Sequence, residues 1–329
     1  MSKIKGFRKK RDLLALLIIA IYICVCGMEN VQAAEKEKFP TKMIKVIVPQ
    51  PPGASIDMEP RGFVPYLAKK LGVDVMIENM AGAGGKMGLT KVWKADPDGY
   101  TLAYHGIPQA MVIEFLFKAE YKTKEFAHVF ALSNTNMVLV VHPDNWKTIE
   151  EFLKVAREKT LRGAVPSIGS VSHICGVVSG DKLGMKSNWV FFDGSGEVLT
   201  NVAGKHLDFG IVSTNSAQTL VAAGKIRPLL LYSQAPDQFF PNVPFPKKLG
   251  YTMPIVSSIR GFVAPPKTPA DRVKILRDAM FKVAEDPAYL DWARKRMLEI
   301  APLDGDKYLA ETEKGYAVVD TYKNFFRSQ

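Results

Sequence analysis

Short apolar, β-branched segments alternate with helical segments in the first third of the chain, and this alternation constrains the fold most. Strands are predicted at residues 43–48, 73–78 and 100–104, separated by helices at 58–71 and 89–95. Segments at this spacing form βαβ units, in which consecutive strands lie parallel and helices cover them. The sequence therefore predicts an α/β fold built on a parallel sheet.

The same alternation recurs further along the chain. Additional strands are predicted at residues 129–132, 138–142, 188–192, 209–212, 228–232 and 261–264. We expect two α/β domains with a cleft between them. One domain is discontinuous, formed by residues 34–133 plus 258–329, and the other, residues 134–257, is inserted into it.

Helix-start signals support this reading. Thr148 and Glu151 form a capping box that predicts a helix to about residue 159. Thr268 and Asp286 each precede a proline, the pattern of an N-cap followed by a first-turn proline. A last helix is predicted at 306–326, so the chain should end in helices that pack on the first domain.

The N-terminus has the three parts of a secretory signal. Six basic residues precede Asp12, an apolar run covers residues 13–26, and Val31-Gln32-Ala33 provides small residues at a cleavage site. The apolar run is short for a membrane span. We predict a cleaved signal peptide over residues 1–33 and export to the periplasm, with an uncleaved anchor as the alternative.

Cleavage changes the cysteine and charge counts. Cys24 and Cys26 leave with the signal, so Cys175 remains alone and no intramolecular disulfide is possible. The formal charge falls from +11 to about +7. The remaining bases are scattered, which argues against nucleic acid as a partner. The five histidines lack the paired spacing of a zinc site, so we predict no metal and no cofactor.

Two glycine-containing loops follow the first two predicted strands. In open α/β sheets, ligands bind at the carboxyl ends of strands, and a helix N-terminus offers unpaired N–H groups to an anion. Ser55 or Asp57 is expected to cap the helix after the first loop. The second loop only partly matches dinucleotide and P-loop motifs, because Met87 and Met80 replace required glycines. The candidate ligand-binding residues here are Pro52, Gly53, Ala54, Ser55, Asp57, Gly82, Ala83, Gly84 and Gly85.

Two later loops carry hydroxyl groups. The candidates in them are Ser167, Gly169, Ser170, His173, Gly194 and Ser195. A serine hydrolase would use Ser170 or Ser195 with His173 as its base. No Gly-x-Ser-x-Gly elbow exists in the chain, and triad partners usually come from separate segments. Ligand hydrogen bonding or helix capping is the favoured role. Asp193 and Glu197 are acidic, which fits poorly with an anion site.

The order of these motifs resembles the tripartite tricarboxylate transporter receptor family, also called Bug proteins. The resemblance covers essentially the whole mature chain. It rests on Pro51-Pro52-Gly53-Ala54-Ser55-Ile56-Asp57 with Arg61, Glu78-Asn79, the glycines at 82–85, Pro97 to Leu102, Gly169-Ser170, Ser172-His173, Gly194-Ser195 and Ala223-Gly224-Lys225. Asp193 stands where the family has Lys, and Val212 where it often has Asp.

The resemblance implies a two-domain periplasmic-binding-protein fold of type II-like topology that closes on a ligand. The first two loops would hold one carboxylate through backbone N–H groups and water, and loops of the second domain, with Ser213, would contact the rest. The expected function is capture of a small organic acid for the membrane subunits of a tripartite transporter, by a monomer that is not an enzyme. A sensory binding module for a carboxylate and, less favoured, a secreted serine hydrolase are the alternatives.

Overall fold

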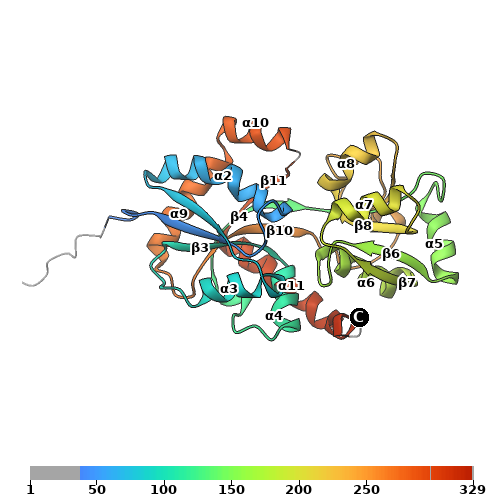
Figure 1. The fold of residues 1–329 in the computed structure, drawn as a ribbon, viewed down its shortest axis with the longest axis horizontal. Coiled ribbons are helices and arrows are strands. Elements are labelled where there is room, and N and C mark those ends of the chain that lie inside the picture. Colours follow the sequence, from blue (N-terminus) through green and yellow to red (C-terminus); the bar gives the residue numbers. More distant parts are fainter. Residues whose placement is uncertain (1–37, 297, 328–329) are drawn as a thin grey trace, which may run out of the picture. The chain divides into compact units, whose positions relative to one another are not determined.

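Two β-sheets organise the chain (Figure 1). The computed structural model describes residues 38–296 and 298–327, and the predicted signal at 1–33 lies outside them. The first sheet has the strand order β11-β4-β10-β3-β1-β2. Its strands are β1 (Ile44–Val48), β2 (Val75–Asn79), β3 (Thr101–Ile107), β4 (Ala127–Thr135), β10 (Ser258–Ala264) and β11 (Ile300–Asp304).

The second sheet is formed by the middle of the chain and has the order β7-β6-β8-β5-β9. Its strands are β5 (Met137–Val141), β6 (Leu161–Val165), β7 (Ser187–Phe191), β8 (Phe209–Ser213) and β9 (Arg227–Tyr232). Both sheets are mixed rather than wholly parallel. β10 and β5 pair antiparallel with both of their neighbours, whereas β1 pairs parallel with β2 and β3, and β6 with β7 and β8.

Helices follow most of the strands. They are α2 (Ser55–Leu71), α3 (Lys86–Trp93), α4 (Gln109–Leu116), α5 (Ile149–Glu158), α6 (Val171–Leu183), α7 (Ser195–Ala203), α8 (Thr214–Ala222), α9 (Ala270–Ala284), α10 (Pro287–Lys295) and α11 (Gly305–Arg327). The α/β fold class predicted from the sequence is confirmed. In the described part of the chain, no helix has both the length and the apolar character needed to cross a membrane.

The helix-start predictions have mixed outcomes. The Thr148 hydroxyl accepts the Glu151 N–H, and Asp286 caps α10 by accepting the Ala288 N–H, as expected. The prediction for Thr268 is wrong, because its hydroxyl donates to the Pro265 carbonyl and Pro269 occupies the N-cap. The N-cap of α2 is Ala54, which has no capping side chain, so neither Ser55 nor Asp57 is the cap.

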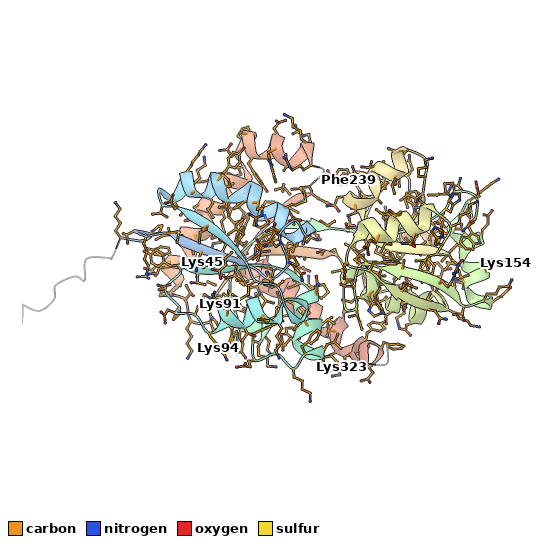
Figure 2. The ribbon with its side chains drawn as sticks, viewed as in Figure 1. Lys45, Lys91, Lys94, Lys154, Phe239 and Lys323 are labelled. Carbon is orange, nitrogen blue, oxygen red and sulfur yellow. The ribbon has the colours of Figure 1, made fainter. Side chains whose placement is uncertain are left out.

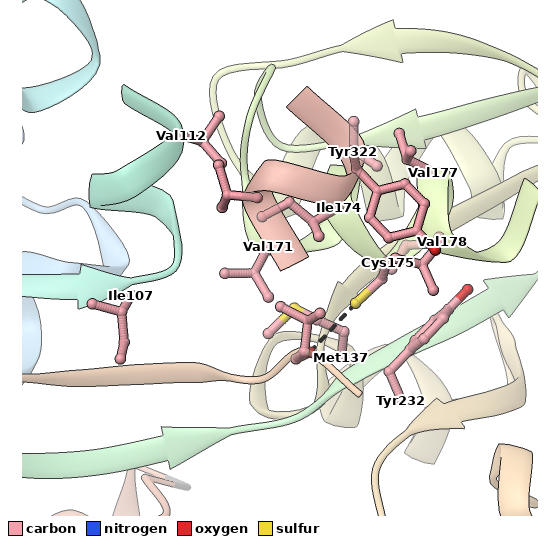
Figure 3. Packing of buried hydrophobic residues seen from close by; sticks show 14 of the residues in the cluster. Ile107, Val112, Met137, Val171, Ile174, Cys175, Val177, Val178, Tyr232 and Tyr322 are labelled. Carbon is pink, nitrogen blue, oxygen red and sulfur yellow. Dashed lines mark hydrogen bonds between the residues drawn. The ribbon is translucent and has the colours of Figure 1, made fainter. Parts of the chain in front are cut away.

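The C-terminal helix contacts elements of both sheets. α11 packs on β4 and α4 and also on α6. Figure 3 shows Tyr322 of α11 beside Val177 and Val178 of α6, and the Tyr322 hydroxyl donates to Asp181. One buried cluster includes residues from both sheets. The predicted division into domains at residues 134 and 257 stays a prediction.

Candidate functional site

The loops after β1 and β2 meet at one edge of the first sheet. β1 and β2 are parallel neighbours, and the pairing of Val48 with Asn79 brings their carboxyl ends level. The first loop is residues 49–57, and the second is residues 79–88. The Gln50 side-chain amide joins them by donating to the Gly84 carbonyl at 3.1 Å.

A small pocket of about 20 Å³ lies between these loops and the end of β3. Its volume accommodates one water-sized group. Its walls include Ile56, Gly84 and Gly85. Within residues 38–296 and 298–327, the N–H groups of Ile56 and Gly84 donate to no protein acceptor. Ile56 lies in the first turn of α2, where helical N–H groups are unpaired and the helix dipole favours negative charge.

Asp57 holds the first loop rather than facing the pocket. Its side chain is only 1% exposed. Oδ2 accepts bonds from the Gly53 N–H at 2.8 Å and from Arg61 Nε at 2.6 Å, while Oδ1 accepts from the Asn79 amide at 2.8 Å. Burial alone would raise the pKa of Asp57, but the hydrogen bonds from Arg61, Gly53 and Asn79 lower it. We therefore assign Asp57 the role of holding the first loop in position.

The second loop needs glycine where it borders the pocket. Gly84 has φ 70° and Gly85 has φ 113°, both in the left-handed region that favours glycine. A Cβ at Gly85 would lie 3.0 Å from the Pro49 carbonyl oxygen. The two loops therefore approach each other closely at Gly85 and Pro49.

The pocket has no side chain that carries a permanent positive charge. None of its lining residues is Lys or Arg. The nearby Lys86 Nζ donates to the Phe117 carbonyl at 2.9 Å, and Arg61 is bonded to Asp57 and Asn79. Lys94, Lys154 and Lys323 project outward from different elements (Figure 2). An anion here would be held by backbone N–H groups.

A larger hollow of about 490 Å³ lies near the other end of β1 and β3. Its lysines form ion pairs with carboxylates: Lys42 with Asp98, Lys45 with Glu78, and Lys94 with Glu120. It is remote from the glycine loops, so we do not assign the ligand site to it.

Sequence reasoning missed the third wall of the pocket. It consists of the end of β3 and the start of α4, with His105, Gly106, Gln109, Ala110 and Ile113. No glycine-rich loop marks this turn, because β3 passes directly through Pro108 into α4. The available signal was its position, since β3 is the other neighbour of β1.

The third loop, residues 167–173, caps a helix. Ser170 is the N-cap of α6: its hydroxyl accepts the His173 N–H and donates to the Ser167 carbonyl at 2.7 Å. His173 Nδ1 accepts the Gly169 N–H at 3.1 Å. Burial lowers the pKa of His173 to about 4. In this arrangement the Ser170 hydroxyl bonds backbone groups rather than the imidazole, which argues against a hydrolase that uses Ser170.

The second-sheet candidates lie outside the pocket. A Cβ at Gly169 would be 2.7 Å from Val112, so the third loop touches α4, whose N-terminus borders the pocket. Gly194 and Ser195 begin α7, and the Ser213 hydroxyl bonds that of Ser216 at the start of α8. Their predicted ligand contacts stay predictions. No group of three His, Cys, Asp or Glu side chains in the described residues is placed to hold a metal.

Comparison with known proteins identifies a matching family and related proteins. The profile of the tripartite tricarboxylate transporter family receptors matches residues 61–311. The chain is 27% identical to Protein BugT of Bordetella pertussis over 84% of this chain and 86% of the relative.

Solved structures share the fold. A TctC solute-binding protein from Polaromonas has a TM-score of 0.77 and 25% identity, covering 89% of this chain and 100% of that one. MatC from Rhodopseudomonas palustris with bound malate has a TM-score of 0.72 and 25% identity, covering 85% and 100%. The two-domain periplasmic-binding-protein fold predicted for the chain is confirmed by these neighbours. The chain belongs to the tripartite tricarboxylate transporter receptor family.

Proposed function

We propose that this protein is a periplasmic solute-binding protein that captures a small organic acid and releases it unchanged. One observation carries the proposal. Ile56 and Gly84 line the same pocket, and their N–H groups donate to no acceptor in the described part of the chain; no Lys, Arg, Asp or Glu lines this pocket. Oriented N–H dipoles at a helix start bind a carboxylate without a formal cation.

The family supports the proposal, and so does the malate bound to MatC. In this account the acid passes to the membrane subunits of a tripartite transporter, and the receptor is a monomer. It reaches the periplasm through a cleaved signal at residues 1–33. Residues 34–133 plus 258–329 and residues 134–257 act as two domains that close on the ligand. The third loop, the loop at residues 192–197 and Ser213 contact its far end.

The proposal is tested by calorimetric titration of the mature protein with mono-, di- and aromatic carboxylates, together with the matching amides. We expect saturable binding of at least one acid, no binding of its amide, and recovery of the acid unchanged. Binding of the amide as tightly as the acid would contradict a carboxylate site. Conversion of the acid during the titration would contradict a receptor.

A further inference from the structure

Apolar side chains continue from the small pocket along α4 to the protein surface. Ile113 lines the pocket, and Phe117 follows it by one helical turn, with its N–H donating to the Ile113 carbonyl. A Cβ placed on Gly84 would lie 3.4 Å from the Ile113 side chain and 3.5 Å from the Phe117 ring, so both side chains border the second loop. Phe117 is nevertheless 41% exposed. The apolar wall of the pocket therefore extends outward to solvent.

Two further apolar side chains are exposed beside the same elements. Met87, at the start of α3, lies against Gly82 of the second loop and is 57% exposed. Ile168 is 39% exposed and belongs to the third loop, which touches α4. We call Met87, Phe117 and Ile168 the apolar rim. Exposed apolar side chains that gather beside a pocket are typical of a ligand-binding groove.

A second charged group on the ligand would gain little at the apolar rim. Lys86 is adjacent, but its Nζ already donates to the Phe117 carbonyl at 2.9 Å. A carboxylate held against apolar side chains loses hydration without gaining hydrogen bonds, whereas a methylene group or an aromatic ring gains free energy by leaving water.

The size of the pocket determines which part of an acid meets the rim. The pocket admits one water-sized group, which suits a single carboxylate oxygen. The rest of the acid then lies outside the pocket. The nearest surface continuous with the pocket wall is Phe117, which shares its contact with Gly84 with the pocket residue Ile113.

We propose that the apolar rim binds the hydrocarbon body of the ligand, so that the protein selects longer aliphatic or aromatic monocarboxylic acids over short acids and dicarboxylic acids. This assignment rests on the proposed function and adds the ligand class. Its structural basis is the continuity between the pocket residue Ile113 and the exposed ring of Phe117, both beside Gly84.

The test measures the dissociation constants of acetate, butyrate, hexanoate and adipate by calorimetry. Adipate is hexanoate with a second carboxylate at its far end, so this pair isolates the effect of the added charge. We expect the affinity of the wild-type protein to rise about two- to fourfold with each added methylene group. Hexanoate should bind roughly tenfold or more tightly than adipate.

Substitutions of Phe117 locate the effect. Phe117→Ser removes the ring but retains the backbone carbonyl that Lys86 contacts. It should weaken hexanoate binding roughly tenfold and leave acetate binding within about threefold of wild type. Phe117→Leu retains an apolar side chain and should keep most of the preference for hexanoate.

Phe325→Ser is the matched control. Phe325 is 50% exposed near the end of α11 and does not line the pocket, so this variant should bind all four acids as the wild-type protein does. If Phe117→Ser fails to fold, Ile168→Ser tests the rim from the third loop and should weaken hexanoate binding about threefold or more, with acetate binding unchanged.

Three results would overturn the assignment. The first is equal wild-type affinity for acetate and hexanoate, and the second is an unchanged preference for hexanoate in Phe117→Ser. The third is tighter binding of adipate than of hexanoate, which would place the second carboxylate on a cation such as Lys86. In all three, an acid still binds and the proposed function stands. Absence of binding of every acid in the panel would refute the proposed function, and this assignment with it.

Discussion

The side-chain amide of Asn79, the last residue of β2, donates a 2.8 Å hydrogen bond to Oδ1 of Asp57 in the first turn of α2. The same amide donates to the Gln50 carbonyl at 2.9 Å. One side chain therefore fixes both ends of the first loop to the strand that leads into the second loop. The relative placement of the Ile56 and Gly84 N–H groups depends on this link.

Removing the Asn79 side chain, which links the two loops, should weaken ligand binding. We expect Asn79→Ala to weaken binding of the best acid by roughly tenfold and to lower the free energy of unfolding by about 1–3 kcal/mol, because Asp57 Oδ1 then loses its buried donor. Calorimetry and urea unfolding measure the two effects. Lys94→Ala removes an exposed ion pair and should change both quantities little. Wild-type binding by Asn79→Ala would contradict this role.

The lowered pKa of Asp57 predicts how stability changes with pH. The ionised carboxylate is favoured in the folded protein, so its contribution is complete above the ordinary pKa of about 3.9 and is lost as the pH falls. The destabilisation caused by Asp57→Asn, measured by urea unfolding, should therefore shrink as the pH decreases below about 4. The exposed Asp74 provides the control substitution Asp74→Asn, whose effect should be small throughout. A destabilisation by Asp57→Asn that grows toward acid would be the contrary result.

Substitutions at Gly84 and Lys86 distinguish a carboxylate site formed by backbone N–H groups from one formed by a side-chain salt bridge. Gly84→Val forces a β-branched residue into φ 70° beside Ile113, at 3.4 Å, and should reduce affinity more than about tenfold. Lys86→Ala removes only the bond to the Phe117 carbonyl and should cost less than about threefold. Calorimetry on both variants decides the question. A strong loss for Lys86→Ala with near-normal binding by Gly84→Val would favour a side-chain salt bridge.

Cys175 should be unreactive in the folded protein. It is 1% exposed, its Sγ lies 3.4 Å from the Val256 carbonyl, and burial raises the pKa of the thiol well above its usual range. We expect no maleimide labelling of the mature protein under native conditions and complete labelling in denaturant, followed by mass spectrometry. Rapid native labelling would show that α6 opens readily.

The sequence predicted the elements whose patterns are local. β1, β2 and β3 were found because each is a short apolar run ended by turn residues, and Gly72, at φ 71°, ends α2 as expected. α4 was missed, because it is buried on most sides and so shows little helical periodicity. The start of α6 was anticipated from the loop at residues 167–173, but its extent was not, for the same reason. β6 contains Gly163 and Arg162, which weaken its strand pattern.

Only part of the candidate site could be predicted from the sequence, because only part of it has a local sequence pattern. Glycine loops and helix starts are visible in sequence, so the loops after β1 and β2 could be named. The role of Asp57 depends on Asn79, 22 residues away, and His105 becomes part of the wall only when β3 pairs with β1. Contacts made by tertiary packing leave no local pattern, which is why the third wall had to come from the structure.

The carboxylate site on backbone N–H groups is tested most directly by removing one of those groups. Ile56→Pro deletes the N–H in the first turn of α2, where proline is tolerated, and Ile56→Ala shortens the same side chain but keeps the N–H. The measurement is the dissociation constant of the best acid for both variants by calorimetry. We predict a loss of roughly tenfold or more for Ile56→Pro and less than about threefold for Ile56→Ala. Equal affinities of the two variants would contradict the account.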